Sequence, residues 1–184
     1  MKTAITGGIG SGKSFVCRQL RAHGIRIYDC DEAAKRLIRT STELRSQLRA
    51  LIGSLDKADI ARFLLADEAN ARAIDTIVHP AVARDFLDSG YQWMECAILY
   101  ESGFDRLVDR VVVVTAPLEV RIARVMQRDG ISREKVLQWM DRQAPQQLLR
   151  QRADYEIVND GTTPLAPQIA PLLPTDKGKQ SNIK

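Results

Sequence analysis

Short apolar runs alternate with segments of helical periodicity along much of the chain. The apolar runs are typical of strands because they are brief and are bounded by glycine, proline or polar residues. The run from Val111 to Val114 is wholly aliphatic, which predicts a strand in a sheet covered on both faces. The predicted strands are residues 2–6, 25–28, 93–99, 110–115 and 154–158.

Helical patterns fill the intervals between the predicted strands. One helix is predicted from Lys13 to a stop at Gly24, because glycine favours the left-handed backbone that ends a helix. Another helix is expected to begin at Pro117 and end at Gly130, and Ser132 is placed to cap the next one.

The longest helical stretch covers residues 41–89. It is predicted to be interrupted near Gly53 and again at His79-Pro80, because the residue before a proline disfavours helical geometry. A stretch of this length exceeds a single crossover helix, so we interpret it as an inserted subdomain.

Strands that alternate with helices predict an α/β fold with a parallel sheet and helices on both faces. The chain of 184 residues suits one domain, which we place at residues 1–174. Residues 117–152 form a second helical excursion, and the polar residues 175–184 are interpreted as a flexible tail.

Composition excludes several classes of protein. No apolar run approaches the eighteen residues of a membrane span, and the N-terminal segment lacks the apolar core of a signal peptide. Three cysteines, without metal-type pairing, predict reduced thiols in a cytoplasmic protein. The net charge of +4 is compatible with a nucleic acid, an acidic membrane or a small anion as partner.

The sequence Gly7-Gly8-Ile9-Gly10-Ser11-Gly12-Lys13-Ser14 fits G-x-x-x-x-G-K-[ST] and lies between a predicted strand and a predicted helix. In such a loop backbone N–H groups cradle phosphates, the lysine reaches the β- and γ-phosphates, and the hydroxyl binds Mg²⁺. The motif therefore predicts a nucleotide and Mg²⁺ as ligands. Phe15 stands where many such loops have a second hydroxyl, so one α-phosphate contact is expected to be missing.

The absence of other nucleotide-binding motifs excludes several classes of nucleotide-binding protein. The D-x-x-G and N-K-x-D motifs of a GTPase do not occur, and the aliphatic run before Thr115 does not end in the acidic residue of motor-type ATPases. A small kinase with a small acceptor remains. A kinase for another nucleoside or metabolite, and a nucleotide-binding regulator without turnover, are the alternatives.

A kinase of this kind needs a carboxylate near the acceptor hydroxyl. Asp31 follows the second predicted strand, at the sheet edge where ligands gather in parallel folds. The alternative is that Asp31 caps the predicted helix 32–38, a role for which Asp29 competes.

Cationic groups are also required around the transferred phosphoryl group. Arg121, Arg124 and Arg128 fall on one face of the helix that follows Pro117. We predict that Arg124 and Arg128 contact phosphate and that Arg121 is a bystander. The alternative is a solvated face on which Glu119 and Asp129 pair with the arginines.

Two further polar residues are candidates for acceptor binding. Glu101 ends the third apolar run, and a surface ion pair is its alternative role. His79 precedes Pro80, and a structural histidine is its alternative role.

Taken together, these segments resemble the dephospho-coenzyme A kinase family. The most specific are T-G-G-I-G-S-G-K-S, from Thr6 to Ser14, and R-V-M-Q-R-D-G, from Arg124 to Gly130. The other matching segments are residues 27–31, 79–80, 98–101, 111–117, 143, 154 and 159–161.

The resemblance implies ATP-dependent phosphorylation of the ribose 3′-hydroxyl of dephospho-CoA, with Asp31 as general base and Lys13 and Arg124 as further catalytic residues. It implies a five-stranded parallel P-loop core, a CoA-side helical subdomain at about 41–89 and a lid at about 117–150. The implied ATP-binding residues are Gly7, Gly8, Gly10, Ser11, Gly12, Lys13, Ser14, Phe15, Arg124 and Arg128. The implied acceptor-binding residues are Asp31, His79 and Glu101, and Ser14 is the implied Mg²⁺ ligand.

The chain departs from the family pattern at Ala97, where a proline is common, at Phe15, where threonine is usual, and in a short stretch before His79. The positive charge is concentrated between Gly103 and Arg152, which hold ten Lys and Arg against six Asp and Glu. We therefore attribute the surplus to phosphate handling and expect no nucleic acid or membrane partner.

Overall fold

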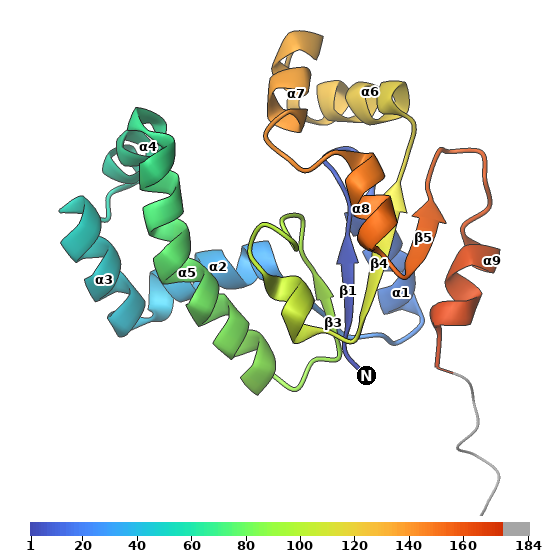
Figure 1. Ribbon diagram of the computed structural model, residues 1–184, viewed down its shortest axis with the longest axis horizontal. Helices are drawn as coiled ribbons and strands as arrows, with labels where there is room; N and C mark the ends of the chain where they lie inside the picture. The colour runs from blue at the N-terminus through green and yellow to red at the C-terminus, as the bar shows by residue number, and fades with distance from the viewer. Residues whose placement is uncertain (175–184) are drawn as a thin grey trace, which may run out of the picture. The chain divides into compact units, whose positions relative to one another are not determined.

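The computed structural model describes residues 1–174, so the predicted tail at 175–184 lies outside the described residues. The strands form a five-stranded sheet of order β2-β3-β1-β4-β5, which confirms the predicted parallel α/β core. They are β1 (Thr3–Thr6), β2 (Ile27–Asp29), β3 (Trp93–Glu95), β4 (Arg110–Thr115) and β5 (Tyr155–Val158) (Figure 1).

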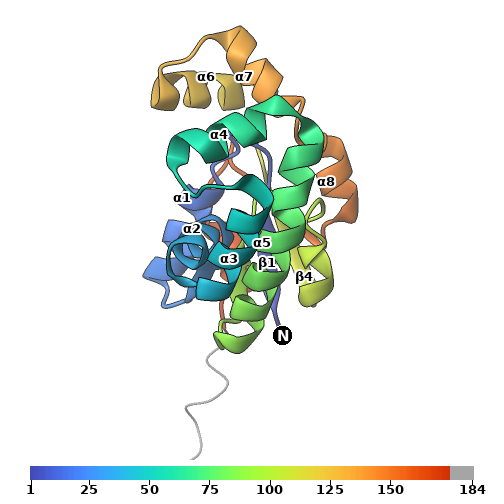
Figure 2. The same ribbon diagram turned by 90° about the vertical axis from the view of Figure 1, so that its left-hand side faces the viewer.

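The chain divides into two compact units. Unit 1 comprises Met1–Thr6 and Arg26–Val111. Its helices are α2 (Cys30–Thr40), α3 (Thr42–Ile52), α4 (Lys57–Ala66), α5 (Glu68–Asp88) and the 3₁₀ helix η1 (Phe104–Leu107). Helix α5 packs against α2, α3 and α4, and Figure 2 shows α3 and α4 beside it. In β2–β3–β1, Tyr28 lies opposite Met94, which lies opposite Ala4.

Helix α5 continues through His79-Pro80, so the predicted break there is wrong. Proline removes one N–H donor and strains the preceding turn, but a proline inside a helix can be tolerated where packing holds both sides. Val78, Val82 and Phe86 are buried along one face of α5, before and after the proline. Their burial in the core of unit 1 outweighs the local preference against helix.

Strand β3 ends at Glu95, so the prediction that it continues to Leu99, with Glu101 at its end, is wrong. Residues 97–103 form consecutive turns instead. The N–H of Phe104 donates to the carbonyl of Leu99 at 2.9 Å, and both side chains are buried. The apolar residues of this run are therefore buried by a folded turn rather than by a longer strand.

Among the described residues, unit 2 comprises Gly7–Ile25 and residues 112–174. Its helices are α1 (Lys13–Ala22), α6 (Leu118–Asp129), α7 (Arg133–Met140), α8 (Gln146–Arg152), α9 (Ala166–Ile169) and the 3₁₀ helix η2 (Ala170–Leu172). The predicted start and stop signals are confirmed: α6 follows Pro117 and ends before Gly130, whose φ is 65°, and Ser132 Oγ accepts the N–H of Lys135 in α7.

Two cores stabilise unit 2. Val112, Val113 and Val114 of β4 are fully buried, which confirms the prediction for this aliphatic strand. Helices α6 and α7 share a second cluster of buried residues, Ile122, Val125 and Val136, against which Ile9 also packs.

Within residues 1–174, no helix has the length and apolar character that crossing a membrane requires. All three cysteines lie in this part of the chain; each is buried and none forms a disulfide.

Candidate active site

The segment between β1 and α1 is a glycine-rich loop, residues 7–12, that leads into the N-terminus of α1 (Figure 1). Gly10 and Gly12 have φ values of 78° and 88°, and no side chain caps the start of α1. Within the described chain, the N–H groups of these two glycines donate to no protein acceptor. Unused donors at a helix N-terminus attract an anion, so the loop has the character of a phosphate site.

Glycine is also required at these positions by close packing. A Cβ on Gly12 would collide with the side-chain amide of Asn159, and a Cβ on Gly10 would lie 2.5 Å from the backbone oxygen of Arg121. The loop therefore cannot accept larger residues at either position without rearrangement.

Side chains from the second half of unit 2 hold the carbonyl groups of the loop. Arg121 Nε donates to the carbonyl of Ile9 at 2.9 Å, and Asn159 Nδ2 donates to that of Ser11 at 2.9 Å. Arg124 Nη1 donates to the carbonyl of Ser11 at 3.3 Å and to that of Asn159 at 2.9 Å. These contacts fix one side of the loop.

The predicted ATP-binding residues of the loop form one continuous segment with α1. Lys13 is half-buried and Ser14 is exposed, and both lie in the first turn of α1. Ser11 is fully buried, and its hydroxyl has no hydrogen-bond partner within the described residues. Phe15 is exposed and lies beside the guanidinium of Arg18.

The three arginines of α6 have different environments. Arg121 is only 8% exposed and donates to a loop carbonyl, a structural contact that the sequence did not predict; that it makes no phosphate contact stays a prediction. Burial lowers the pKa of Arg121 below its ordinary value. Arg128 is exposed and makes two hydrogen bonds to the carboxylate of Asp129, which is the partner considered for it from the sequence. Arg124 is half-buried between the loop and Asn159.

A cavity of about 440 Å³ adjoins the loop. It is lined by Gly12 and Phe15, by Arg124, and by residues of the turn 159–165. Within this turn Asp160 accepts the N–H groups of Thr162 and Thr163. These hydrogen bonds hold the pKa of the Asp160 carboxyl well below its usual range. The volume is within the range of small-molecule sites.

In unit 1 the first turn of α2 carries Asp31. Asp29 Oδ1 accepts the N–H of Glu32 at 3.0 Å, so Asp29 is the N-cap of this helix. Helix α2 begins at Cys30, and Asp31 is an exposed residue of its first turn. The capping role that competed for Asp31 is therefore filled by Asp29.

The carboxyl ends of β2 and β3 lie side by side in unit 1, because Asp29 pairs in register with Glu95. Cys30 and Cys96 follow these two residues, and both thiols are buried. A hydrogen bond with Cys96, together with burial, raises the pKa of the Cys30 thiol above its ordinary value. Asp31 therefore follows a tightly packed pair of strand ends.

The two other predicted acceptor residues also lie in unit 1. His79 is on α5, with Nε2 3.4 Å from a carboxylate oxygen of Asp75 and its ring edge-on to Phe104. Glu101 is exposed in the turns that precede Phe104. The structure thus brings His79 next to the segment that carries Glu101, and neither residue is at the end of a strand.

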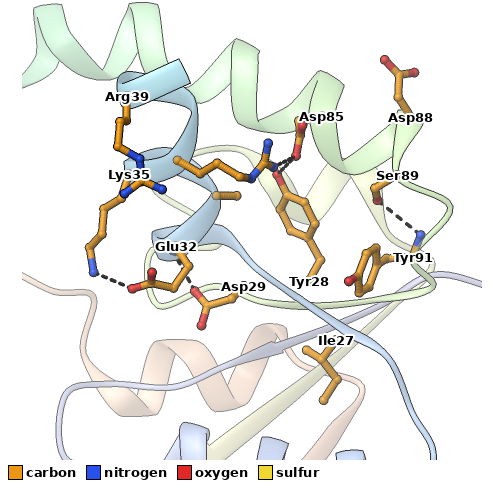
Figure 3. Close-up of a pocket in the computed structure, with 12 residues that line it drawn as sticks. Ile27, Tyr28, Asp29, Glu32, Lys35, Arg39, Asp85, Asp88, Ser89 and Tyr91 are labelled. Carbon is orange, nitrogen blue, oxygen red and sulfur yellow. Dashed lines mark hydrogen bonds and ion pairs between the residues drawn. The ribbon is translucent and has the colours of Figure 1, made fainter. Parts of the chain in front are cut away.

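A larger cavity of about 630 Å³ in unit 1 is lined by β2, α2 and the C-terminal end of α5 (Figure 3). The Tyr28 hydroxyl donates to Asp85 Oδ2 at 2.6 Å, and Arg36 forms an ion pair with the same carboxylate. Burial and the Asp85 carboxylate raise the pKa of Tyr28 above its ordinary value. Asp31 does not line this cavity.

Sequence reasoning missed three residues that hold the phosphate loop: Arg121, Gln143 and Asn159. Gln143 Oε1 accepts the N–H of Ile9 at 2.7 Å. Gln143 and Asn159 belong to segments that carried the family resemblance, which was the available signal, although it assigned them no role.

Comparison with known proteins agrees with this geometry. The family model for dephospho-CoA kinase (CoaE) matches residues 1–164. A dephospho-CoA kinase of Bacteroides fragilis is 38% identical, with 94% of this chain and 91% of the relative covered. One from Porphyromonas gingivalis is 37% identical, with 97% and 95% covered.

The fold is also similar to that of a solved structure. A Thermus thermophilus protein of known crystal structure superposes with a TM-score of 0.82 at 32% identity, covering 94% of this chain and 95% of the other. The match over residues 1–164 and the identity of the relatives over nearly the whole chain lead to one conclusion: this chain belongs to the dephospho-CoA kinase family.

Proposed function

We propose that this chain transfers the γ-phosphoryl group of ATP to the ribose 3′-hydroxyl of dephospho-CoA, giving CoA and ADP in the last step of coenzyme A biosynthesis. The family match over residues 1–164 carries the proposal. The phosphate loop supports it, because the N–H groups of Gly10 and Gly12 have no protein acceptor in the described chain.

On the nucleotide side, residues 7–15 bind the phosphates, with backbone N–H groups along the chain of oxygens and Lys13 at the β- and γ-phosphates. The cavity beside Phe15 and Arg124 takes the nucleoside. Arg124 donates to the loop carbonyl of Ser11 and also lines the cavity. Arg128 extends the cationic face once it exchanges Asp129 for phosphate.

Mg²⁺ is expected with the ATP phosphates, and Ser14 would hold it. The described residues contain no cluster of three or more acidic, histidine or cysteine side chains suited to a metal. A single hydroxyl fits Mg²⁺ nonetheless, because this ion is commonly bound through substrate phosphates and water with few protein ligands. When bound, it would neutralise charge on the phosphate oxygens.

On the acceptor side, Asp31 is the general base. The 3′-hydroxyl oxygen forms a bond to the γ-phosphorus, the bond from that phosphorus to the β,γ-bridging oxygen breaks, and the hydroxyl proton passes to the Asp31 carboxylate. His79 and Glu101 bind the acceptor, with residues 41–89 as the CoA-side subdomain and residues 117–150 as a lid.

The test is an assay of the purified chain with ATP, Mg²⁺ and dephospho-CoA, in which CoA and ADP are separated by chromatography. We expect equal amounts of the two products, and none from a Lys13→Met variant of the same fold. If CoA does not form while another nucleoside or a sugar is phosphorylated, the chain is a kinase for that acceptor instead. If ADP binds but no acceptor is phosphorylated, the result favours the alternative that the chain is a nucleotide-binding regulator without turnover.

A further inference from the structure

Ile9 is held at both of its backbone groups by side chains of the same unit. Its N–H donates to Gln143 Oε1 at 2.7 Å, and its carbonyl accepts Arg121 Nε–H at 2.9 Å. Its side chain packs on the apolar cluster formed by α6 and α7. The apex of the phosphate loop is therefore held at three points, by α6, by the α6–α7 cluster and by the bend between α7 and α8 that carries Gln143.

The contact with Arg121 also fixes an amide donor. A trans peptide directs its N–H opposite to its carbonyl, and the described chain contains no cis peptide bond. With the carbonyl of Ile9 turned toward Arg121, the N–H of Gly10 is turned away from it. That N–H is one of the loop donors without a protein acceptor in the described chain.

Burying the charged side chain of Arg121 costs free energy. This cost indicates that the hydrogen bond between Arg121 and the Ile9 carbonyl serves the phosphate loop. Its side chain is nine-tenths buried, and no carboxylate in the described chain lies within ion-pairing distance of it. A buried charge without a countercharge is unfavourable, and carbonyl oxygens compensate it only in part. Its guanidinium lies over Gly8, so closely that a Cβ there would be 2.5 Å from one of its nitrogens.

We propose that Arg121 is a positioning residue for the phosphate loop: by holding the Ile9 carbonyl it presents the Gly10 N–H to the nucleotide phosphates. This role rests on the proposed nucleotide site and is independent of which acceptor is phosphorylated. It assigns α6 a second task besides carrying Arg124, because one helix then sets the shape of the loop that binds phosphate.

The experiment compares Arg121→Met and Arg121→Lys with a matched control, Arg133→Met. Arg133 is an exposed arginine of the same unit, paired with Glu119 at 2.6 and 2.7 Å, and it makes no contact with the loop. For each protein, circular dichroism establishes the fold, and calorimetric titration measures the affinity for ADP and for adenosine.

We expect Arg121→Met to weaken ADP binding by about 10- to 100-fold, the usual effect of losing a charge-assisted hydrogen bond. Adenosine binding should be unchanged, because adenosine has no phosphate for the loop to hold. Arg121→Lys keeps the charge but not the planar fork, so its ADP affinity should lie between those of Arg121→Met and the natural chain. The ADP affinity of Arg133→Met should equal that of the natural chain.

Two results would overturn the proposal: ADP affinity that stays unchanged in a folded Arg121→Met, or ADP and adenosine affinities that fall together. If Arg121→Met does not fold, the ADP and adenosine affinities of Arg121→Lys are compared with those of the natural chain, and the same two results would overturn the proposal. A protein that shows the ADP-specific loss but does not phosphorylate dephospho-CoA supports the role of Arg121 and contradicts the proposed acceptor.

Discussion

Asp29 caps helix α2 by accepting the N–H of Glu32 at 3.0 Å, and this contact separates the roles of two neighbouring aspartates. From the sequence, Asp31 is a candidate either for the general base or for the helix cap, and Asp29 competes for the cap. Because Asp29 makes the cap, mutation of Asp29 tests capping and mutation of Asp31 tests the proposed general base.

Replacing Asp29 by alanine should lower the stability of the fold. The N–H of Glu32 would lose its side-chain acceptor, at a cost of about 1 kcal/mol, the usual loss for an N-cap. Urea unfolding followed by circular dichroism measures this loss, with Asp29→Asn as the control that keeps a capping oxygen. An alanine variant as stable as the natural chain would show that the cap contributes nothing.

Replacing Asp31 by asparagine should slow turnover. An amide cannot take the hydroxyl proton, and general bases usually contribute roughly 10²- to 10⁴-fold to rate. Steady-state kinetics give kcat, and titration with ADP should give the affinity of the natural chain, because the proposed nucleotide-binding residues are unchanged. Near-normal kcat would remove Asp31 from the chemistry.

Replacing Asp85 by alanine should destabilise unit 1. Asp85 accepts the Tyr28 hydroxyl at 2.6 Å and pairs with Arg36, so its loss leaves the largely buried Tyr28 hydroxyl without its short hydrogen bond. We expect a loss of about 1–3 kcal/mol in the free energy of unfolding.

The control for Asp85 is Asp59→Ala, which removes an ion pair with the exposed Arg62 and should cost less than about 1 kcal/mol. In the Tyr28→Phe background the Asp85→Ala change should cost less than in the natural chain, because one partner is already missing. Equal costs in the two backgrounds would mean that Tyr28 and Asp85 are energetically independent.

Replacing Ser14 by alanine should raise the Mg²⁺ concentration needed for half-maximal activity. If one oxygen ligand contributes about 1.4 kcal/mol, the increase is roughly 10-fold. Unfolding curves recorded in parallel establish that the variant is folded. Titrating activity with Mg²⁺ at saturating ATP measures the shift, and an unaltered Mg²⁺ requirement would argue that another group holds the ion.

The cysteines should resist alkylation in the folded protein. All three thiols are buried, and the pKa of Cys30 is raised by its hydrogen bond with Cys96 and by burial. At about pH 9 an exposed cysteine, with a pKa near 8.5, is largely the reactive thiolate, whereas Cys30 remains protonated. Mass spectrometry after iodoacetamide treatment should show labelling only in denaturant; rapid native labelling of Cys30 would contradict its burial.

Several features were predictable from the sequence because they depend on residues close together in the chain. The phosphate loop, the aliphatic strand β4 and the helix signals at Gly130 and Ser132 are patterns of this kind. Each follows from backbone preferences or local periodicity, and the structure contains them where they were expected.

Other features depended on tertiary packing. Helix α5 passes through Pro80 because buried side chains on either side hold it, and β3 ends at Glu95 because Leu99 is buried by a turn. Arg121 and Ile9 are 112 residues apart, and no local pattern predicts that Arg121 and Arg124, but not Arg128, donate hydrogen bonds to loop carbonyls. The sequence by itself determined the loop, the order of the elements and the family. The tertiary structure decided which side chains hold the loop, because hydrogen bonds between distant residues form only when packing brings them together.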